Sequence, residues 1–236
     1  MRVALFSDIH GHITGLKAVL ARLKWLGGAD AVYCLGDMIG GGPGLDDVLD
    51  LLLEHNVQMA RGNWDEVFVD LDAHLAHLPV EHHADVLRMY EWSSSRLSSA
   101  YQKLLADLPL SHTVTLSPQH TLFLCHAAPD NAWANCCRAD TPVDELRRTF
   151  GAIEAQAIAY GHYHAHHVRQ MDEKLLINVA SVGLGWHGLA AMTMLDCANG
   201  QLTVRQYQVP YDMVEHERLV KQRQMPDSPA IWYWRD

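Results

Sequence analysis

Short apolar runs of strand length alternate with helix-spaced apolar positions along the first 65 residues. Residues 3–6 and 31–35 are apolar runs, and 57–61 form a third, more mixed segment. Between them, residues 14–26 and 45–53 repeat leucine and valine at helical spacing. This order of strand, helix, strand, helix, strand predicts an α/β fold with a parallel core.

Residues 66–108 follow a different pattern. Apolar positions from 84 to 108 recur mostly at helical spacing, interrupted only by the serines at 93–95. We expect helices that cover the functional site or one edge of the sheet. No linker, repeat or low-complexity tract separates this cap segment from the rest, so residues 1–236 are interpreted as a single domain.

The second half of the chain is rich in predicted strands. Asn199-Gly200, between two apolar segments, is the strongest hairpin signal in the sequence. The predicted strands are 113–116, 121–125, 155–160, 175–179, 189–197 and 201–209. Helices are expected at 142–153, with Thr141 as N-cap, and at 211–224. The C-terminal region 211–236 ends in an aromatic tail, which we expect to pack on the domain or on a second subunit, as a homodimer would allow.

Composition narrows the class of protein. Of the 236 residues, 49% are hydrophobic, which fits a full core, but no run of eighteen apolar residues predicts a membrane span. The N-terminus does not read as a signal peptide. Five irregularly spaced cysteines favour reduced thiols and a cytoplasmic protein. A net charge of −10 argues against loose binding to nucleic acid.

Polar side chains follow the first three predicted strands. Asp8 and His10 come after the first strand, Asp37 after the second and Asn63 after the third. Because ligands of such sheets bind beyond the carboxyl ends of the strands, these residues are expected to converge. Carboxylate, amide and imidazole groups together suit a divalent cation of the Mn, Fe, Zn or Ni type. A phosphate substrate remains compatible with the acidic chain, because bound metal reverses the local field.

Five ordered motifs resemble those of the calcineurin-like metallophosphoesterase superfamily: Asp8-Ile9-His10, Gly36-Asp37, Gly62-Asn63-Trp64-Asp65, His126 and Gly161-His162-Tyr163-His164. The segments 36–43, 61–63 and 107–109 also resemble its small prokaryotic phosphodiesterase branch. The resemblance covers nearly the whole chain. It implies a four-layer αββα sandwich, in which two mixed β-sheets pack face to face between flanking helices.

The resemblance also implies two divalent metal ions. Asp8, His10, Asp37 and His164 would hold one ion, and Asp37, Asn63, His126 and His162 the other. Asp37 would bridge them, since a carboxylate has two oxygens and can bind two cations about 3.5–4 Å apart. A hydroxide bridging the two ions would attack phosphorus in line.

One position departs from the family pattern. Trp64 stands where the family has a histidine that donates a proton to the leaving group or contacts phosphate, and indole does not titrate in this range. His12 is the first candidate for a replacement catalytic residue; an exposed loop histidine is the alternative. Asp65 is interpreted as orienting the Asn63 loop, with a helix N-cap as the alternative.

The leading hypothesis is a phosphoesterase acting on a phosphodiester or phosphoanhydride of a small, nucleotide-like molecule. The alternatives are a phosphomonoesterase or protein phosphatase, and a metal-binding scaffold that has lost turnover. Gly40 to Gly44 is expected to form a tight turn at the cleft rim. His166, His167 and His187 are weaker site candidates. The remaining histidines are expected at the surface: His55, His74, His77, His82, His83, His112, His120 and His216.

Overall fold

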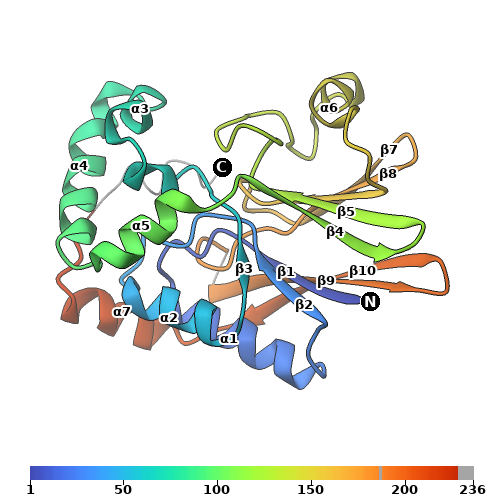
Figure 1. The fold of residues 1–236 in the computed structure, drawn as a ribbon. Coiled ribbons are helices and arrows are strands. Elements are labelled where there is room, and N and C mark those ends of the chain that lie inside the picture. Colours follow the sequence, from blue (N-terminus) through green and yellow to red (C-terminus); the bar gives the residue numbers. More distant parts are fainter. Residues whose placement is uncertain (186–187, 228–236) are drawn as a thin grey trace.

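A computed structural model describes residues 1–185 and 188–227. In this part of the chain, ten strands form two five-stranded sheets (Figure 1). The first contains β1 (Arg2–Phe6), β2 (Ala31–Cys34), β3 (Gln58–Met59), β9 (Leu189–Ala198) and β10 (Gln201–Pro210), in the order β10-β9-β1-β2-β3. The second contains β4 (Ser111–Ser117), β5 (His120–Cys125), β6 (Ala157–Tyr160), β7 (His167–Met171) and β8 (Lys174–Asn178), in the order β4-β5-β6-β8-β7.

Both sheets are mixed. β1, β2 and β3 are parallel, as the sequence predicts, and β9 and β10 extend the same sheet as an antiparallel hairpin. In the second sheet β5, β6 and β8 are parallel, with antiparallel β4 and β7 at the edges. The parallel strands of each sheet therefore bring their carboxyl ends to one side of the molecule.

Side chains that alternate along each strand pack on both faces of each sheet. The result is four layers, with the two sheets between two layers of helices. In β1, Val3 and Leu5 belong to the core between the sheets, whereas Ala4 and Phe6 belong to the core under the helices. In β6, Ala157 and Ala159 face the first sheet, and the alternate residues join an outer core. Two-sided burial explains why these strands read as continuous apolar runs. The predicted αββα sandwich is confirmed.

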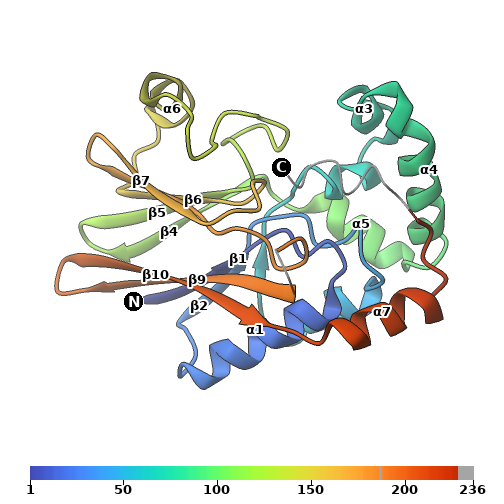
Figure 2. The same ribbon diagram turned by 180° about the vertical axis from the view of Figure 1, so that it is seen from behind.

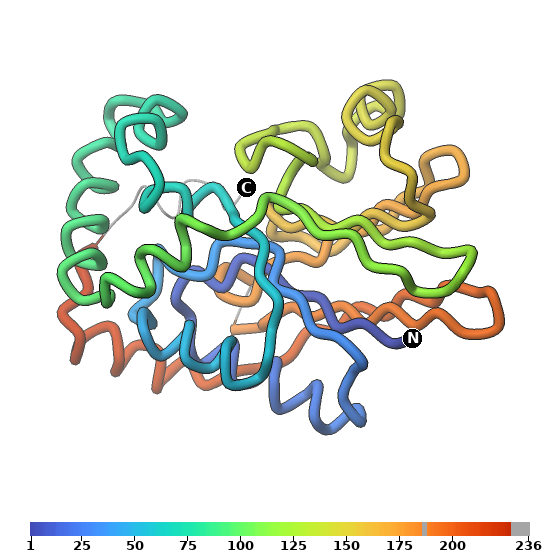
Figure 3. The backbone as a smooth tube through the Cα atoms, viewed as in Figure 1, coloured from blue at the N-terminus to red at the C-terminus, as the bar shows by residue number. Residues whose placement is uncertain are grey.

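Helices cover the outer faces of both sheets. The described helices are α1 (Ile13–Trp25), α2 (Asp46–Glu54), α3 (Leu71–Ala76), α4 (Val80–Ser94), α5 (Ser99–Asp107), α6 (Val143–Phe150), α7 (Met213–Gln222) and the 3₁₀ helix η1 (Asp65–Phe68). α1, α2 and α7 lie on the first sheet and α6 on the second (Figures 1 and 2). α3, α4 and α5 stand together at one end of the molecule, in the teal to green part of the tube in Figure 3.

Several local predictions need correction. The strand expected at 57–61 shrinks to the two residues of β3, and β7 was missed because its pattern is polar and only Met171 is fully buried. Pro142, not Thr141, is the N-cap of α6. The helix α4 runs into the serine cluster, where the Ser93 hydroxyl donates to the Met89 carbonyl at 2.7 Å.

Two histidines assigned to the surface are buried. His74 is 1% exposed and His216 is 7% exposed. Polar residue type alone does not reveal such burial, since both rings pack among other aromatic side chains. His187 and the aromatic tail 231–234 lie outside the described residues. Within the described residues, no helix has the length and apolar character that a membrane span requires.

Candidate metal centre

Four of the predicted ligands sit in strained turns at the strand ends. Asp8, His10, Asp37 and His162 have φ angles of 54°, 47°, 55° and 66°. Positive φ costs a non-glycine residue on the order of 1–3 kcal/mol and persists where the surrounding structure enforces it. The fold therefore tolerates an unfavourable backbone free energy at four positions, and this backbone directs the four side chains toward one point.

Glycines beside the ligands permit the turns to touch. A Cβ on Gly62 would lie 2.1 Å from Asp37 Oδ1, and a Cβ on Gly161 would lie 2.1 Å from the Ser7 hydroxyl. No side chain fits at such distances. This close backbone approach gives a physical reason for the Gly-Asn and Gly-His pairs in the motifs.

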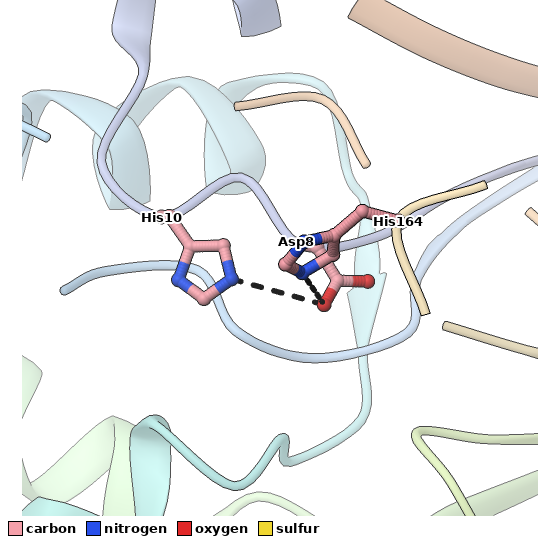
Figure 4. Close-up of side chains that lie close together, drawn as sticks. All are labelled: Asp8, His10 and His164. Carbon is pink, nitrogen blue, oxygen red and sulfur yellow. Dashed lines mark ion pairs between the residues drawn. The ribbon is translucent and has the colours of Figure 1, made fainter. Parts of the chain in front are cut away.

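A first group of donor atoms surrounds Asp8 (Figure 4). Asp8 Oδ1 lies 3.8 Å from His10 Nε2 and 3.4 Å from His164 Nε2, and His10 Nε2 lies 3.5 Å from Asp37 Oδ2. Ligand atoms on one cation at about 2.1 Å lie roughly 3.0–3.4 Å apart. Among the described residues, Asp8 Oδ1 and His10 Nε2 are buried without a hydrogen-bond partner. They suit a cation between them.

A second group adjoins it through Asp37. His126 Nε2 lies 3.5 Å from Asp37 Oδ2 and 2.8 Å from Asn63 Oδ1. His162 Nδ1 lies 3.0 Å from the same Asn63 oxygen and 3.3 Å from His126 Nε2. All seven predicted ligands thus converge, and Asp37 stands between the two groups.

Hydrogen bonds to backbone carbonyls determine which ring nitrogen His10 and His126 direct at the donor groups. His10 Nδ1 donates to the Gly40 carbonyl at 2.8 Å, and His126 Nδ1 donates to the Leu35 carbonyl at 2.8 Å. In both rings the Nε2 lone pair is then directed at the carboxylates, as metal ligation requires. This bond places Gly40, the first residue of the glycine-rich loop, against the His10 ring, although residues 40–44 do not line the cavity.

Asp65 braces the turns. Its carboxylate accepts hydrogen bonds from the backbone N–H groups of Asp37 (2.8 Å), Met38 (3.1 Å) and Gly62 (2.8 Å). Asp65 therefore orients both the Asp37 turn and the Asn63 loop. It also begins the 3₁₀ helix η1, but its side chain caps nothing there.

Ser181 and Asn178 support the turns from the second sheet. The Ser181 hydroxyl donates to the Asp8 carbonyl at 2.8 Å, and the Asn178 amide donates to the Gly161 carbonyl at 2.9 Å. Both side chains are fully buried. They fix the backbone on either side of the ligands without belonging to the donor groups.

Three carboxylates are buried close together, and nearby positive charge would stabilise their ionised forms. Burial would raise the pKa of Asp8, but the neighbouring imidazoles, His10 first, hold it well below its usual range. Burial and the charges of Asp8 and Asp65 raise the pKa of Asp37 well above its usual value. Burial raises the pKa of Asp65 to about 6. Divalent cations would offset this repulsion, so the residues present fit a metal centre.

The donor groups open into a cavity of about 480 Å³. Metal-facing residues line one part of its wall, and the other part comes from Trp64, from the cap and from the loop 127–142 between β5 and α6. The residues of that second part include Trp64, His77, Trp133, Asn135, Arg138 and Asp140. The sequence did not predict the contribution of this loop. Its only signal was an aromatic and charged segment directly after His126.

An aromatic cluster connects the cap with the metal-facing wall. The His77 ring stacks on Trp133 at 4.7 Å, and His74 packs edge-on against both Trp133 and Trp64. The Trp133 indole N–H donates to Glu66 Oε2 at 2.9 Å. Trp64 is therefore part of a packed wall rather than a mobile side chain.

His12 lies elsewhere. It is 2% exposed, stacks on His216 of α7 at 4.1 Å, and is not among the residues that line the cavity. The structure thus places the proposed replacement acid under the first turn of α1, in packing contact with α7. The alternative interpretation of His12 as an exposed loop histidine is wrong, because the side chain is buried, and the ring does not line the cavity as a catalytic acid there would.

Residues 1–200 match the family model described as the calcineurin-like phosphoesterase superfamily domain. The chain belongs to this family, as its five motifs predicted. An uncharacterised protein of Methanocaldococcus jannaschii is 24% identical to it over 94% of this chain and 93% of its own length.

Two solved structures share the fold over nearly their whole length. A hypothetical protein of Pyrococcus horikoshii superposes with a TM-score of 0.80 at 20% identity, covering 96% of this chain and 94% of its own. A metallophosphoesterase of Sphaerobacter thermophilus gives 0.71 at 20% identity, covering 97% and 96%. Membership of the family makes this chain a hydrolase of the metal-dependent phosphoesterase class.

Proposed function

We propose that the protein hydrolyses a phosphodiester or phosphoanhydride of a small, nucleotide-like molecule with two divalent metal ions. The observation that carries this proposal is the convergence of seven ligand side chains on a shared Asp37, beside an open cavity. Asp8, His10, Asp37 and His164 would hold one ion, and Asp37, Asn63, His126 and His162 the other. Bound there, the ions would neutralise phosphoryl oxygens and lower the pKa of a water molecule.

The protein's own residues hold the metal-facing side chains in position and keep water out of part of the cavity. The Gly40 and Leu35 carbonyls hold the His10 and His126 rings, so that the ligands need little reorganisation. Asp65 holds the Asp37 and Asn63 turns in register. Trp64 lines one side of the cavity. Its apolar ring would displace water there and so lower the local dielectric constant around a bound phosphate.

The cavity favours a small-molecule ester over a protein surface. A volume of about 480 Å³ falls within the usual range for small ligands. Its wall combines metal-facing groups with the indoles of Trp64 and Trp133, a combination that suits a phosphate attached to an aromatic or heterocyclic group. Assays of bis-aryl against mono-aryl phosphate esters test this choice, and faster hydrolysis of the monoester would favour the phosphomonoesterase alternative.

The first experiment replaces metal ligands. We expect Asp37→Asn and His126→Ala each to weaken metal affinity and activity together by more than about 100-fold, because second-shell changes alone cost 10–100-fold. Mn²⁺ titration calorimetry measures affinity, and bis-aryl phosphate hydrolysis measures activity. His55→Ala, an exposed histidine at the end of α2, is the matched control.

Two outcomes would contradict the proposal. Full activity in either ligand variant would remove the assignment of that residue. A wild-type protein that binds metal but hydrolyses no member of a broad phosphate-ester panel would support the metal-binding scaffold instead.

A further inference from the structure

Two adjacent cysteines lie beside the cavity with their sulfurs almost in contact. Cys136 Sγ is 3.2 Å from Cys137 Sγ, and both are free thiols. A disulfide has an S–S length of about 2.05 Å, so the two sulfurs need to approach by only about 1 Å. The other three cysteines are fully or nearly fully buried within the cores.

Cys136 has the character of a reactive thiol. Its partner's S–H donates to it, which lowers the pKa of Cys136 to about 7 against the opposing effect of burial. Its side chain is half-buried, so a small molecule can reach it. Burial raises the pKa of Cys34 and of Cys125, and both are inert by comparison.

The cysteine pair lies between two residues of the cavity wall in the sequence. Its sequence neighbours Asn135 and Arg138 line that cavity. The Cys137 backbone N–H lies 3.4 Å from the Tyr163 hydroxyl, and that hydroxyl donates to Asn135 Oδ1 at 2.9 Å. Tyr163 stands between the ligands His162 and His164. A change of backbone at the cysteines therefore acts on the loop 127–142 and on the turn that carries two ligands.

We propose that Cys136 and Cys137 form a redox-active dithiol, which a hydroperoxide closes to a disulfide, so that the loop wall of the cavity changes shape. The Cys136 thiolate attacks the outer peroxide oxygen, forming a sulfenic acid and releasing an alkoxide, which takes a proton. Cys137 sulfur then attacks the Cys136 sulfur, and the departing hydroxide takes the Cys137 proton as water. Two thiols are oxidised and one hydroperoxide is reduced to an alcohol and water.

The geometry makes such a bond reversible. Adjacent Cα atoms are 3.8 Å apart, below the usual disulfide range of about 4.4–6.8 Å, so the closed ring is strained. Strained disulfides are reduced readily by thiols, which is the behaviour of regulatory rather than structural disulfides. A hydroperoxide would oxidise this pair even where thiols are abundant. The same thiols would reduce the disulfide once the hydroperoxide is consumed.

The test uses the full-length protein and hydrogen peroxide, followed by alkylation, intact mass measurement and peptide mapping. We expect the wild type to lose two hydrogen atoms within the peptide that contains both cysteines, and dithiothreitol to restore them. Cys136→Ser should abolish this loss, and Cys197→Ser is the control that keeps it. Because Cys137 is buried, Cys137→Ala is used only after its thermal unfolding matches the wild type; it should yield a dimedone-trapped sulfenic acid at Cys136.

Hydrogen exchange supplies a readout that does not depend on phosphoesterase activity. We expect oxidation to change exchange in residues 127–142 of the wild type and not of Cys136→Ser. In Mn²⁺-loaded protein, the rate of ester hydrolysis should change several-fold and recover with dithiothreitol. Direct over-oxidation of Cys136 without a disulfide would overturn the dithiol. If oxidation leaves both hydrogen exchange in residues 127–142 and the rate of ester hydrolysis unchanged, the disulfide does not alter the cavity.

Discussion

At the scale of single residues, we expect an imidazole of the cavity wall to serve as the proton donor that Trp64 cannot be. His77 is exposed, lines the same cavity as the metal-facing residues, and is held by its stack on Trp133. His12, by contrast, is buried in contact with His216. A leaving group that extends from the metal centre toward the cap would meet His77.

We expect His77→Ala to lower kcat/KM for esters with alkyl leaving groups by about 100-fold, the size typical of general acid catalysis. Esters with nitrophenyl leaving groups should change by less than about threefold, because they depart without a proton. A series of leaving groups measures the difference, and His55→Ala is the control. Equal losses across the series would indicate that His77 only binds substrate.

The convergence of Asp8, His10, Asp37 and Asn63 was predictable, because each follows a predicted strand. Their assignment as metal ligands came from the resemblance to the family motifs and not from strand order. The burial of His74 and the cavity position of Trp133 could not be predicted, since both depend on contacts between the cap and the loop 127–142. Residue type and spacing carry no information on such contacts between distant segments.

At the scale of elements, the β9–β10 hairpin depends on its two turn residues. Asn199 and Gly200 have φ angles of 51° and 73°, and a Cβ on Gly200 would meet no atom within 4 Å. We expect Gly200→Ala to lower the free energy of unfolding by about 1–2 kcal/mol, purely from the left-handed backbone. Urea denaturation measures it.

Asn199→Gly is the control for this turn, because glycine adopts the same backbone readily and Gly-Gly is also a favoured hairpin pair. It should change stability by about 0.5 kcal/mol or less. If Gly200→Ala costs no more than Asn199→Gly, the turn conformation does not limit the stability of the hairpin.

Elements with a strong apolar pattern were predicted well, and edge elements were not. β1, β6 and β9 are buried on both faces and keep their pattern. β7 is an edge strand with one buried residue, and it forms because β8 offers unpaired backbone groups, which its own sequence does not show. The pairing partner, not local propensity, defines such a strand.

At the scale of the whole molecule, the metal centre joins the two sheets. Asp8, His10, Asp37 and Asn63 follow strands of the first sheet, whereas His126, His162 and His164 follow strands of the second. A cation that binds only this arrangement stabilises the folded state through mass action.

We expect Mn²⁺ at 100 times its dissociation constant to stabilise the protein by about 2.7 kcal/mol, roughly a 5–10 °C rise in Tm. Chelation by EDTA should reverse the rise. Differential scanning calorimetry measures it, with Asp37→Asn as the variant that should gain little. An equal rise in that variant would point to cation binding at another site.

The antiparallel pairing of β1 with β9 also bears on how the chain is made. Arg2 to Leu5 pair with Asp196 to Thr193, so β1 lacks this neighbour until residues 189–198 have been synthesised. Until then its open edge is exposed as a surface on which nascent chains can associate. Shielding of this edge during synthesis would then raise the yield of folded protein in cells.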